Sequence, residues 1–135
     1  YPCSSDAAIA DMEATDFHGI VLPGGWMPDA LRRDRKVLDL VRGFAERRTL
    51  VAAICHGGWI AASAGVYRGV RVTGSPGIRD DLVNAGAVWE DVRVAITPHA
   101  GRRGRNADRP GARERRVALR NVTEILLKGR CNGCG

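Results

Sequence analysis

Short apolar runs alternate with segments of helical spacing along the first hundred residues, and this alternation limits the possible folds more than any other feature. Parallel strands need a crossover between them, usually a helix, so the alternation predicts a parallel sheet with helices on its faces. We therefore expect an α/β fold. The expected strands are 16–22, 49–54, 69–74 and 92–96, and the expected helices are 28–48, 57–65 and 76–86, the last capped by Gly86.

The positive charge of the chain is concentrated in the segment that follows the expected strands in the sequence. The formal net charge is +6 for the chain, −1 for residues 1–100 and +7 for residues 101–135. We therefore place a boundary near Gly101, between an α/β domain over 1–100 and a basic tail over 101–135. The arginine run has no interleaved aromatic residues, which favours a solvated segment over a nucleic-acid partner. Helical spacing within the tail predicts a short amphipathic helix that contains Ala118, Leu119, Val122, Ile125 and Leu126.

The apolar segments and the cysteines indicate the compartment. The sequence contains no run of 18 apolar residues and no basic-then-apolar leader pattern, so we expect a cytoplasmic protein without membrane contact. Its four cysteines are unevenly spread, which favours reduced thiols over a disulfide framework. Cys131 and Cys134 have C-x-x-C spacing, but zinc takes four ligands and a redox pair normally precedes a helix. Neither a metal nor another cofactor is predicted.

One expected strand ends in a thiol, an imidazole and two glycines, within the stretch VAAICHGGW at 51–59. In parallel sheets, ligands bind at the carboxyl ends of the strands, which is where Cys55 lies. The positive end of the following helix favours a thiolate there, and His56 would supply a general base or a cation. Gly57 and Gly58 permit the sharp turn of a nucleophile elbow. This pattern predicts acyl or carbonyl chemistry.

The neighbouring strand ends in Gly24 and Gly25, whose backbone N–H groups would form an oxyanion hole. The candidate catalytic residues are thus Cys55 and His56, and the candidate oxyanion or substrate-binding residues are Gly24, Gly25 and Gly57. The alternative is structural, because free cysteine is among the most buried residue types. Adjacent side chains on a strand also point to opposite faces, so the thiol and the imidazole need not touch. The pattern alone leaves both interpretations open.

Several stretches in order resemble the PfpI family of cysteine-peptidase-like proteins, which belongs to the class I glutamine amidotransferase-like superfamily together with the Parkinsonism-associated deglycases. They are IVLPGGWMPDALRRDRKVLDLVRGF, VAAICHGGW, SAGVYRGVRVTG and PGIRDDLVNAGAVWED, and the resemblance covers 6–96. It implies a flavodoxin-like three-layer sandwich with a mostly parallel sheet, a nucleophile at Cys55, a partner at His56, and oxyanion donors at Gly25 and the His56 backbone. Family members are described as peptidases, cofactor-free glyoxalases or deglycases, some linked to stress responses, and usually form dimers or larger assemblies.

The sequence departs from this family at identifiable positions. Family chains begin with a strand and a helix and carry a glutamate that approaches the cysteine. Glu13 comes too late to match that glutamate, so we expect the first strands to be missing through N-terminal truncation. Arg35 stands where a neighbouring subunit's acid is expected, and Ser75 stands where a tyrosine is common. Peptidase activity is therefore the least expected of the family's activities.

Three functions follow as hypotheses. The first is a cysteine-nucleophile hydrolase, glyoxalase or deglycase that acts through Cys55 on small carbonyl, acyl or peptide substrates, without a cofactor and as a homo-oligomer. The second is a non-enzymatic redox sensor in which the Cys55 thiol is oxidised. The third is an inactive fragment whose basic tail touches polyanions.

Overall fold

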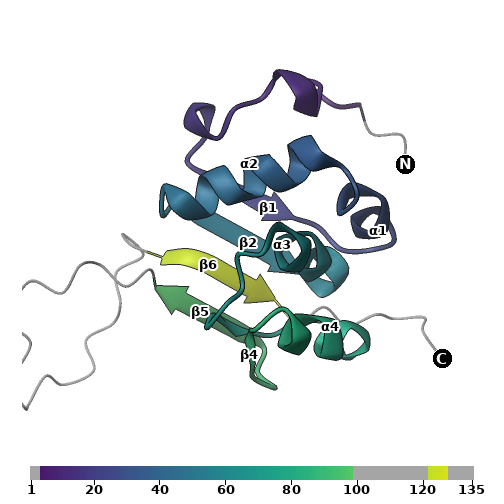
Figure 1. The fold of residues 1–135 in the computed structure, drawn as a ribbon, viewed down its shortest axis with the longest axis vertical. Coiled ribbons are helices and arrows are strands. Elements are labelled where there is room, and N and C mark those ends of the chain that lie inside the picture. The colour runs from purple at the N-terminus through teal and green to yellow at the C-terminus, as the bar shows by residue number, and fades with distance from the viewer. Residues whose placement is uncertain (1–3, 99–121, 128–135) are drawn as a thin grey trace, which may run out of the picture.

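The computed structural model describes residues 4–98 and 122–127, which form one four-stranded sheet, one two-stranded sheet and short helices. The larger sheet has the order β1-β2-β6-β5 (Figure 1). Pairing is parallel from β1 through β2 to β6, and antiparallel between β6 and β5. The smaller sheet pairs β3 and β4 in parallel. The strands are β1 (Gly19–Leu22), β2 (Leu50–Ile54), β3 (Arg71–Val72), β4 (Val88–Trp89), β5 (Val94–Pro98) and β6 (Val122–Leu127).

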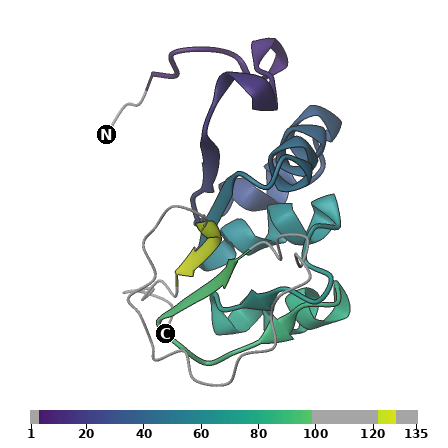
Figure 2. The ribbon, with the colours of Figure 1, turned by 90° about the vertical axis from the view of Figure 1, so that its left-hand side faces the viewer.

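The helices of the described residues lie along one face of the larger sheet (Figure 2). The α-helices are α1 (Met27–Leu31), α2 (Arg35–Glu46), α3 (Gly58–Ala64) and α4 (Arg79–Asn84), and the 3₁₀ turns are η1 (Ile9–Asp11), η2 (Ala14–Asp16), η3 (Cys55–Gly57) and η4 (Pro76–Ile78). The expected alternation of strands and helices is therefore present. No helix of the described residues is long and apolar enough to cross a membrane.

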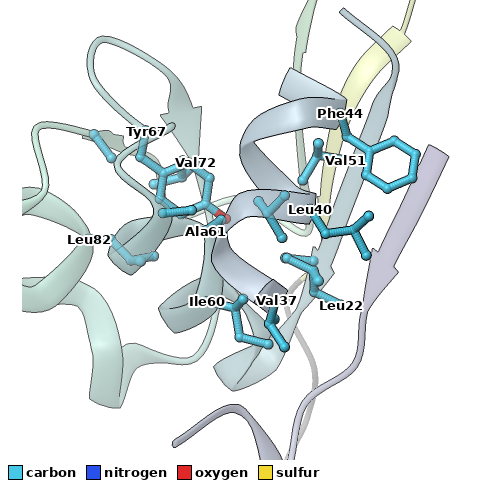
Figure 3. Packing of buried hydrophobic residues seen from close by; sticks show 14 of the residues in the cluster. Leu22, Val37, Leu40, Phe44, Val51, Ile60, Ala61, Tyr67, Val72 and Leu82 are labelled. Atoms are coloured by element: carbon cyan, nitrogen blue, oxygen red, sulfur yellow. The ribbon is translucent and has the colours of Figure 1, made fainter. Parts of the chain in front are cut away.

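The core lies between these helices and the sheet (Figure 3). The apolar residues of α2 recur at three- and four-residue spacing, so they share one face of the helix. Full burial of each such side chain contributes about 1.5–3 kcal/mol. The core thereby holds α2 and α3 against the strand that leads into the candidate site. The buried side chains include Val37, Leu40, Val41 and Phe44 of α2, Ile60, Ala61 and Ala64 of α3, and Leu22, Val51, Ala53 and Ala95 of the larger sheet.

Local signals set the ends of several helices. The helical segment expected from Pro28 onward divides at Asp34, whose side chain accepts hydrogen bonds from the backbone of Lys36 at 2.8 Å and of Val37 at 3.3 Å. This is an N-cap, so α2 begins afresh at the next residue. Gly86, predicted to be a left-handed cap, has φ of 88° and follows α4.

The segment Val122–Leu127 was expected to be part of an amphipathic helix, and that prediction is wrong. It forms strand β6, which inserts between β2 and β5 in the larger sheet. Backbone N–H and C=O groups of both neighbours find partners in β6, and the Val, Thr and Ile of this segment are residues that suit a strand. Ala118 and Leu119 lie outside the described residues, as do the boundary near Gly101 and the C-x-x-C pair, so the domain division stays a prediction.

Candidate active site

Cys55 occupies the turn between β2 and α3, at the carboxyl end of a central strand. Its φ is 57°, in the left-handed region that a non-glycine residue rarely adopts. A conformation of this kind costs about 1–3 kcal/mol and is found mostly where the surrounding structure imposes it, often at functional sites. The sharp strand-to-helix turn expected from the glycine pair is therefore present, and the thiol is held at its apex.

The thiol and the imidazole meet. Cys55 Sγ lies 3.2 Å from His56 Nδ1, within hydrogen-bond range for sulfur. Adjacent residues on an extended strand would point to opposite faces, but Cys55 and His56 belong to the 3₁₀ turn η3. The left-handed backbone at Cys55 thus allows two sequence neighbours to place their side chains together. This contact is what a base-assisted thiol requires.

Two glycines let the backbone pack tightly around the thiol. A Cβ built at Gly57 would collide with the carbonyl oxygen of Leu22 and lie 3.0 Å from that of Pro23. A Cβ at Gly24 would lie 2.7 Å from Cys55 Cβ. The turn after β1 and the turn after β2 therefore touch at positions where a side chain would separate them.

Gly25 plays a different part in the same turn. Its φ is 81°, and a Cβ built there would have no neighbour within 4 Å. Backbone conformation, not crowding, is therefore the reason for glycine at this position. Gly24 and Gly57 are packed against the elbow, whereas Gly25 lies in open space beside it.

Two indoles flank the imidazole. The ring centroids of Trp59 and His56 are 5.0 Å apart with an edge-to-face angle of 68°. Those of Trp26 and His56 are 6.2 Å apart with an angle of 30°. The side chain of Trp26 is 82% exposed, which is unusual for so large an apolar group. In the sequence, the only sign of this arrangement is that Trp26 and Trp59 each follow a glycine of the candidate site.

Sequence reasoning missed two charged residues beside the site. Asp81 accepts a hydrogen bond of 2.7 Å from Trp59 Nε1, and the Arg32 guanidinium lies 5.3 Å from the centroid of the Trp59 ring. Carboxylates at the start of a helix are stabilised by its dipole, and that interpretation conceals the role of Asp81 in the sequence. No sequence signal singles out Arg32.

Arg35 takes no part in this cluster. Arg35 has a 95% exposed side chain, and its Nε is 3.9 Å from Asp39 Oδ2 one helical turn away. Among the residues whose side chains the structure describes, no carboxylate makes a hydrogen bond with His56, and no group of three or more His, Cys, Asp or Glu side chains could hold a metal ion. Ser75 is buried, and its backbone N–H donates to the Cys55 carbonyl at 3.4 Å.

An α/β fold that holds a cysteine in a left-handed turn between a strand and a helix is typical of enzymes with a cysteine nucleophile. Comparison with known protein families identifies the family. The DJ-1/PfpI family matches residues 1–98, so this chain belongs to that family. The resemblance noted in the sequence is thereby confirmed, and so is the flavodoxin-like α/β fold class.

Individual relatives show how much of the family's length is present. The chain is 40% identical over 96 residues to a deglycase of Pyrococcus abyssi, covering 71% of this chain and 58% of that protein. It is 38% identical over 96 residues to the deglycase PfpI of Pyrococcus furiosus, with the same coverage. The crystal structure of Drosophila melanogaster DJ-1beta matches with a TM-score of 0.66 and 25% identity, over 92% of this chain and 54% of that one. The chain thus spans between a half and three fifths of these proteins.

Proposed function

We propose that Cys55 is the nucleophile of a cofactor-free enzyme domain that acts on small carbonyl compounds, with a glyoxalase or deglycase reaction. The contact of 3.2 Å between His56 Nδ1 and the thiol of Cys55, whose backbone is left-handed, carries this proposal. The deglycase names of several relatives support the same chemistry. The catalytic roles of Cys55 and His56, the cytoplasmic location and the homo-oligomeric state remain predictions.

The first step is addition of sulfur to an aldehyde carbon. His56 Nδ1 accepts the thiol proton, the sulfur forms a bond to the carbonyl carbon, and the C=O π electrons move to oxygen. The resulting oxyanion takes the proton back from the imidazolium, which leaves a neutral hemithioacetal. For a 2-oxoaldehyde, the proton on the sulfur-bearing carbon moves to the neighbouring carbonyl carbon, and the hydroxyl proton of the hemithioacetal moves to that carbon's oxygen, which gives the thioester of a 2-hydroxy acid. Water then hydrolyses the thioester, which releases the 2-hydroxy acid and restores the Cys55 thiol. No external oxidant or reductant is consumed.

Backbone donors would stabilise the oxyanion. The first N–H groups of a helix have no partner within the helix, so the start of η3 presents the His56 N–H at the elbow. The Gly25 N–H belongs to the turn that Gly24 brings against Cys55. Donors aimed at developing negative charge are often the largest catalytic contribution in reactions of this type.

Peptide hydrolysis makes demands that this cluster does not meet. An amine leaving group must be protonated, and the imidazole that protonates it is normally oriented by an acceptor. Arg35 cannot accept a hydrogen bond from histidine, and no described carboxylate bonds to His56. Aldehyde addition expels no amine and needs only one proton carrier. Addition of the thiol to a free aldehyde, the glyoxalase-type reaction, is therefore favoured over the peptidase reaction.

A direct test compares the two substrates. The protein should consume methylglyoxal and form lactate, and it should leave a fluorogenic peptide intact. Each assay is paired with a Cys55→Ala variant, and the product is identified by nuclear magnetic resonance. Peptide cleavage that disappears in Cys55→Ala, without consumption of methylglyoxal, would contradict the proposal.

Trp26 is expected to contact the substrate. Its exposed indole lies next to His56, so a bound molecule at the thiol would cover part of it. Loss of an aromatic contact worth about 0.5–1.5 kcal/mol should raise KM by roughly 2- to 12-fold in Trp26→Ala, with kcat almost unchanged. Met27→Ala removes another exposed apolar side chain, which follows Trp26 directly, and serves as the control. Equal KM values for Trp26→Ala and the parent protein would exclude this contact.

A further inference from the structure

The proposed nucleophile depends on an imidazole whose orientation, within residues 4–98, is not set by a hydrogen bond to a carboxylate. In related chemistry a carboxylate or carbonyl holds the second ring nitrogen of a catalytic histidine. Here no described carboxylate bonds to His56, and the ring is instead in contact with Trp59. What holds Trp59 therefore also determines where the imidazole lies relative to Cys55 Sγ.

We propose that Asp81 and Trp59 form a positioning pair that orients His56 toward the Cys55 thiol. This proposal rests on the proposed role of Cys55 as nucleophile. In the proposed reaction, neither Asp81 nor Trp59 touches the reacting atoms. They act through His56, and Asp81 does so from another helix, α4.

The hydrogen bond between the pair fixes the indole. Trp59 Nε1 can only donate, and Asp81 Oδ2 accepts from it at 2.7 Å. Bonds with an ionised partner are roughly twice as strong as neutral ones, so this contact restrains rotation of the indole about its side-chain torsions. This hydrogen bond joins the second residue of α3 to the first turn of α4.

The indole in turn restricts the imidazole. The two rings are 5.0 Å apart and nearly perpendicular, an arrangement that aromatic pairs favour. Rotation of the His56 ring about its outer torsion would bring it against the indole and carry Nδ1 away from Sγ, which lies 3.2 Å from it. The pair therefore sets an orientation without taking or giving a proton.

Arg32, the residue that follows α1, supports the same indole. Its guanidinium lies 5.3 Å from the Trp59 ring centroid, and its Nε donates to Ser63 Oγ at 2.9 Å. The arginine is itself tied to α3 by this bond, so the indole is held at its N–H and over its face. The half-buried indole, which also packs against the core, is thus restrained by two polar side chains as well.

The neighbouring carboxylate offers a matched control. Asp80 and Asp81 both lie in the first turn of α4, so both interact with the helix dipole, but only Asp81 bonds to Trp59. Asp81→Ala, Asp81→Asn, Asp80→Ala, Trp59→Phe and the double variant Trp59→Phe/Asp81→Ala are compared. The main readout is the rate constant for alkylation of Cys55 by iodoacetamide near neutral pH, followed by peptide mapping, together with kcat and KM for methylglyoxal.

Asp81→Ala and Trp59→Phe should each slow alkylation of Cys55 by about 5-fold, as expected for loss of one hydrogen bond. The loss of turnover should appear in kcat rather than in KM. Asp81→Asn keeps an oxygen acceptor and should retain at least half of the parent rate, while Asp80→Ala should match the parent. In the double variant, Asp81→Ala should add nothing to Trp59→Phe, because the acceptor then has no donor.

Two results would overturn the proposal. One is an alkylation rate for Asp81→Ala equal to that for Asp80→Ala, and the other is a full additional effect of Asp81→Ala in the Trp59→Phe background. If Asp81→Ala does not fold, the proposal is tested by the alkylation rates of Asp81→Asn and Trp59→Phe. Equal alkylation rates for those two variants would contradict the positioning pair. Alkylation needs no turnover, so this result is separate from failure of the carbonyl reaction itself.

Discussion

Replacement of Cys55 by alanine should lower the turnover of methylglyoxal by about 10⁴-fold or more, because loss of a nucleophile removes the covalent route altogether. His56→Ala should cost about 10²–10⁴-fold, the range for lost general acid–base catalysis, since the thiol would remain but its proton acceptor at 3.2 Å would not. Both effects are measured as kcat/KM on folded protein. A Cys55→Ala variant with more than a tenth of the parent activity would assign the chemistry to another group.

The strained backbone at Cys55 provides an internal control for this prediction. Glycine adopts a φ of 57° without the steric penalty that any Cβ brings. The free energy of unfolding of Cys55→Gly should therefore exceed that of Cys55→Ala by about 1 kcal/mol. Both variants should be inactive. A more stable and inactive Cys55→Gly protein would indicate that stability is sacrificed at this position to hold the thiol in place.

Gly57→Ala should cause the largest loss of stability among single methyl additions near the site. The new Cβ would collide with the Leu22 carbonyl oxygen and approach the Pro23 oxygen to 3.0 Å, and backbone atoms inside a sheet-to-helix junction cannot swing aside. We expect the free energy of unfolding to fall by about 2–4 kcal/mol, as for severe overpacking, with Cys55 displaced and its alkylation altered.

Gly58→Ala is the control for that substitution. Its Cβ would lie 3.3 Å from Ile78 Cδ1, the flexible end of a side chain, and alanine favours the helix that begins there. Its free energy of unfolding should remain within about 1 kcal/mol of the parent value. Urea denaturation followed by circular dichroism measures both variants. Equal stabilities for Gly57→Ala and Gly58→Ala would contradict the tight junction.

The sequence by itself determined most of the fold and much of the candidate site. Apolar runs and helical spacing are local patterns, and they predicted the alternation of strands and helices as well as the left-handed cap at Gly86. The carboxyl ends of neighbouring parallel strands meet at one edge of a sheet. For that reason the sequence predicts that Cys55 and the Gly24–Gly25 turn lie together, and a Cβ at Gly24 would indeed touch Cys55.

Only the tertiary structure decided the features that depend on distant partners. Segment 122–127 has apolar residues compatible with helical spacing, yet it forms β6 because the backbone groups of β2 and β5 are available on either side. The hydrogen bond from Trp59 to Asp81 joins residues 22 positions apart, and its existence depends on how α4 packs beside α3. Local periodicity reports which face of a segment is buried. It contains no information about which side chain from another helix will meet that face. The contact of Asp81 with the indole beside His56 is therefore visible only in the packing of α4 against α3.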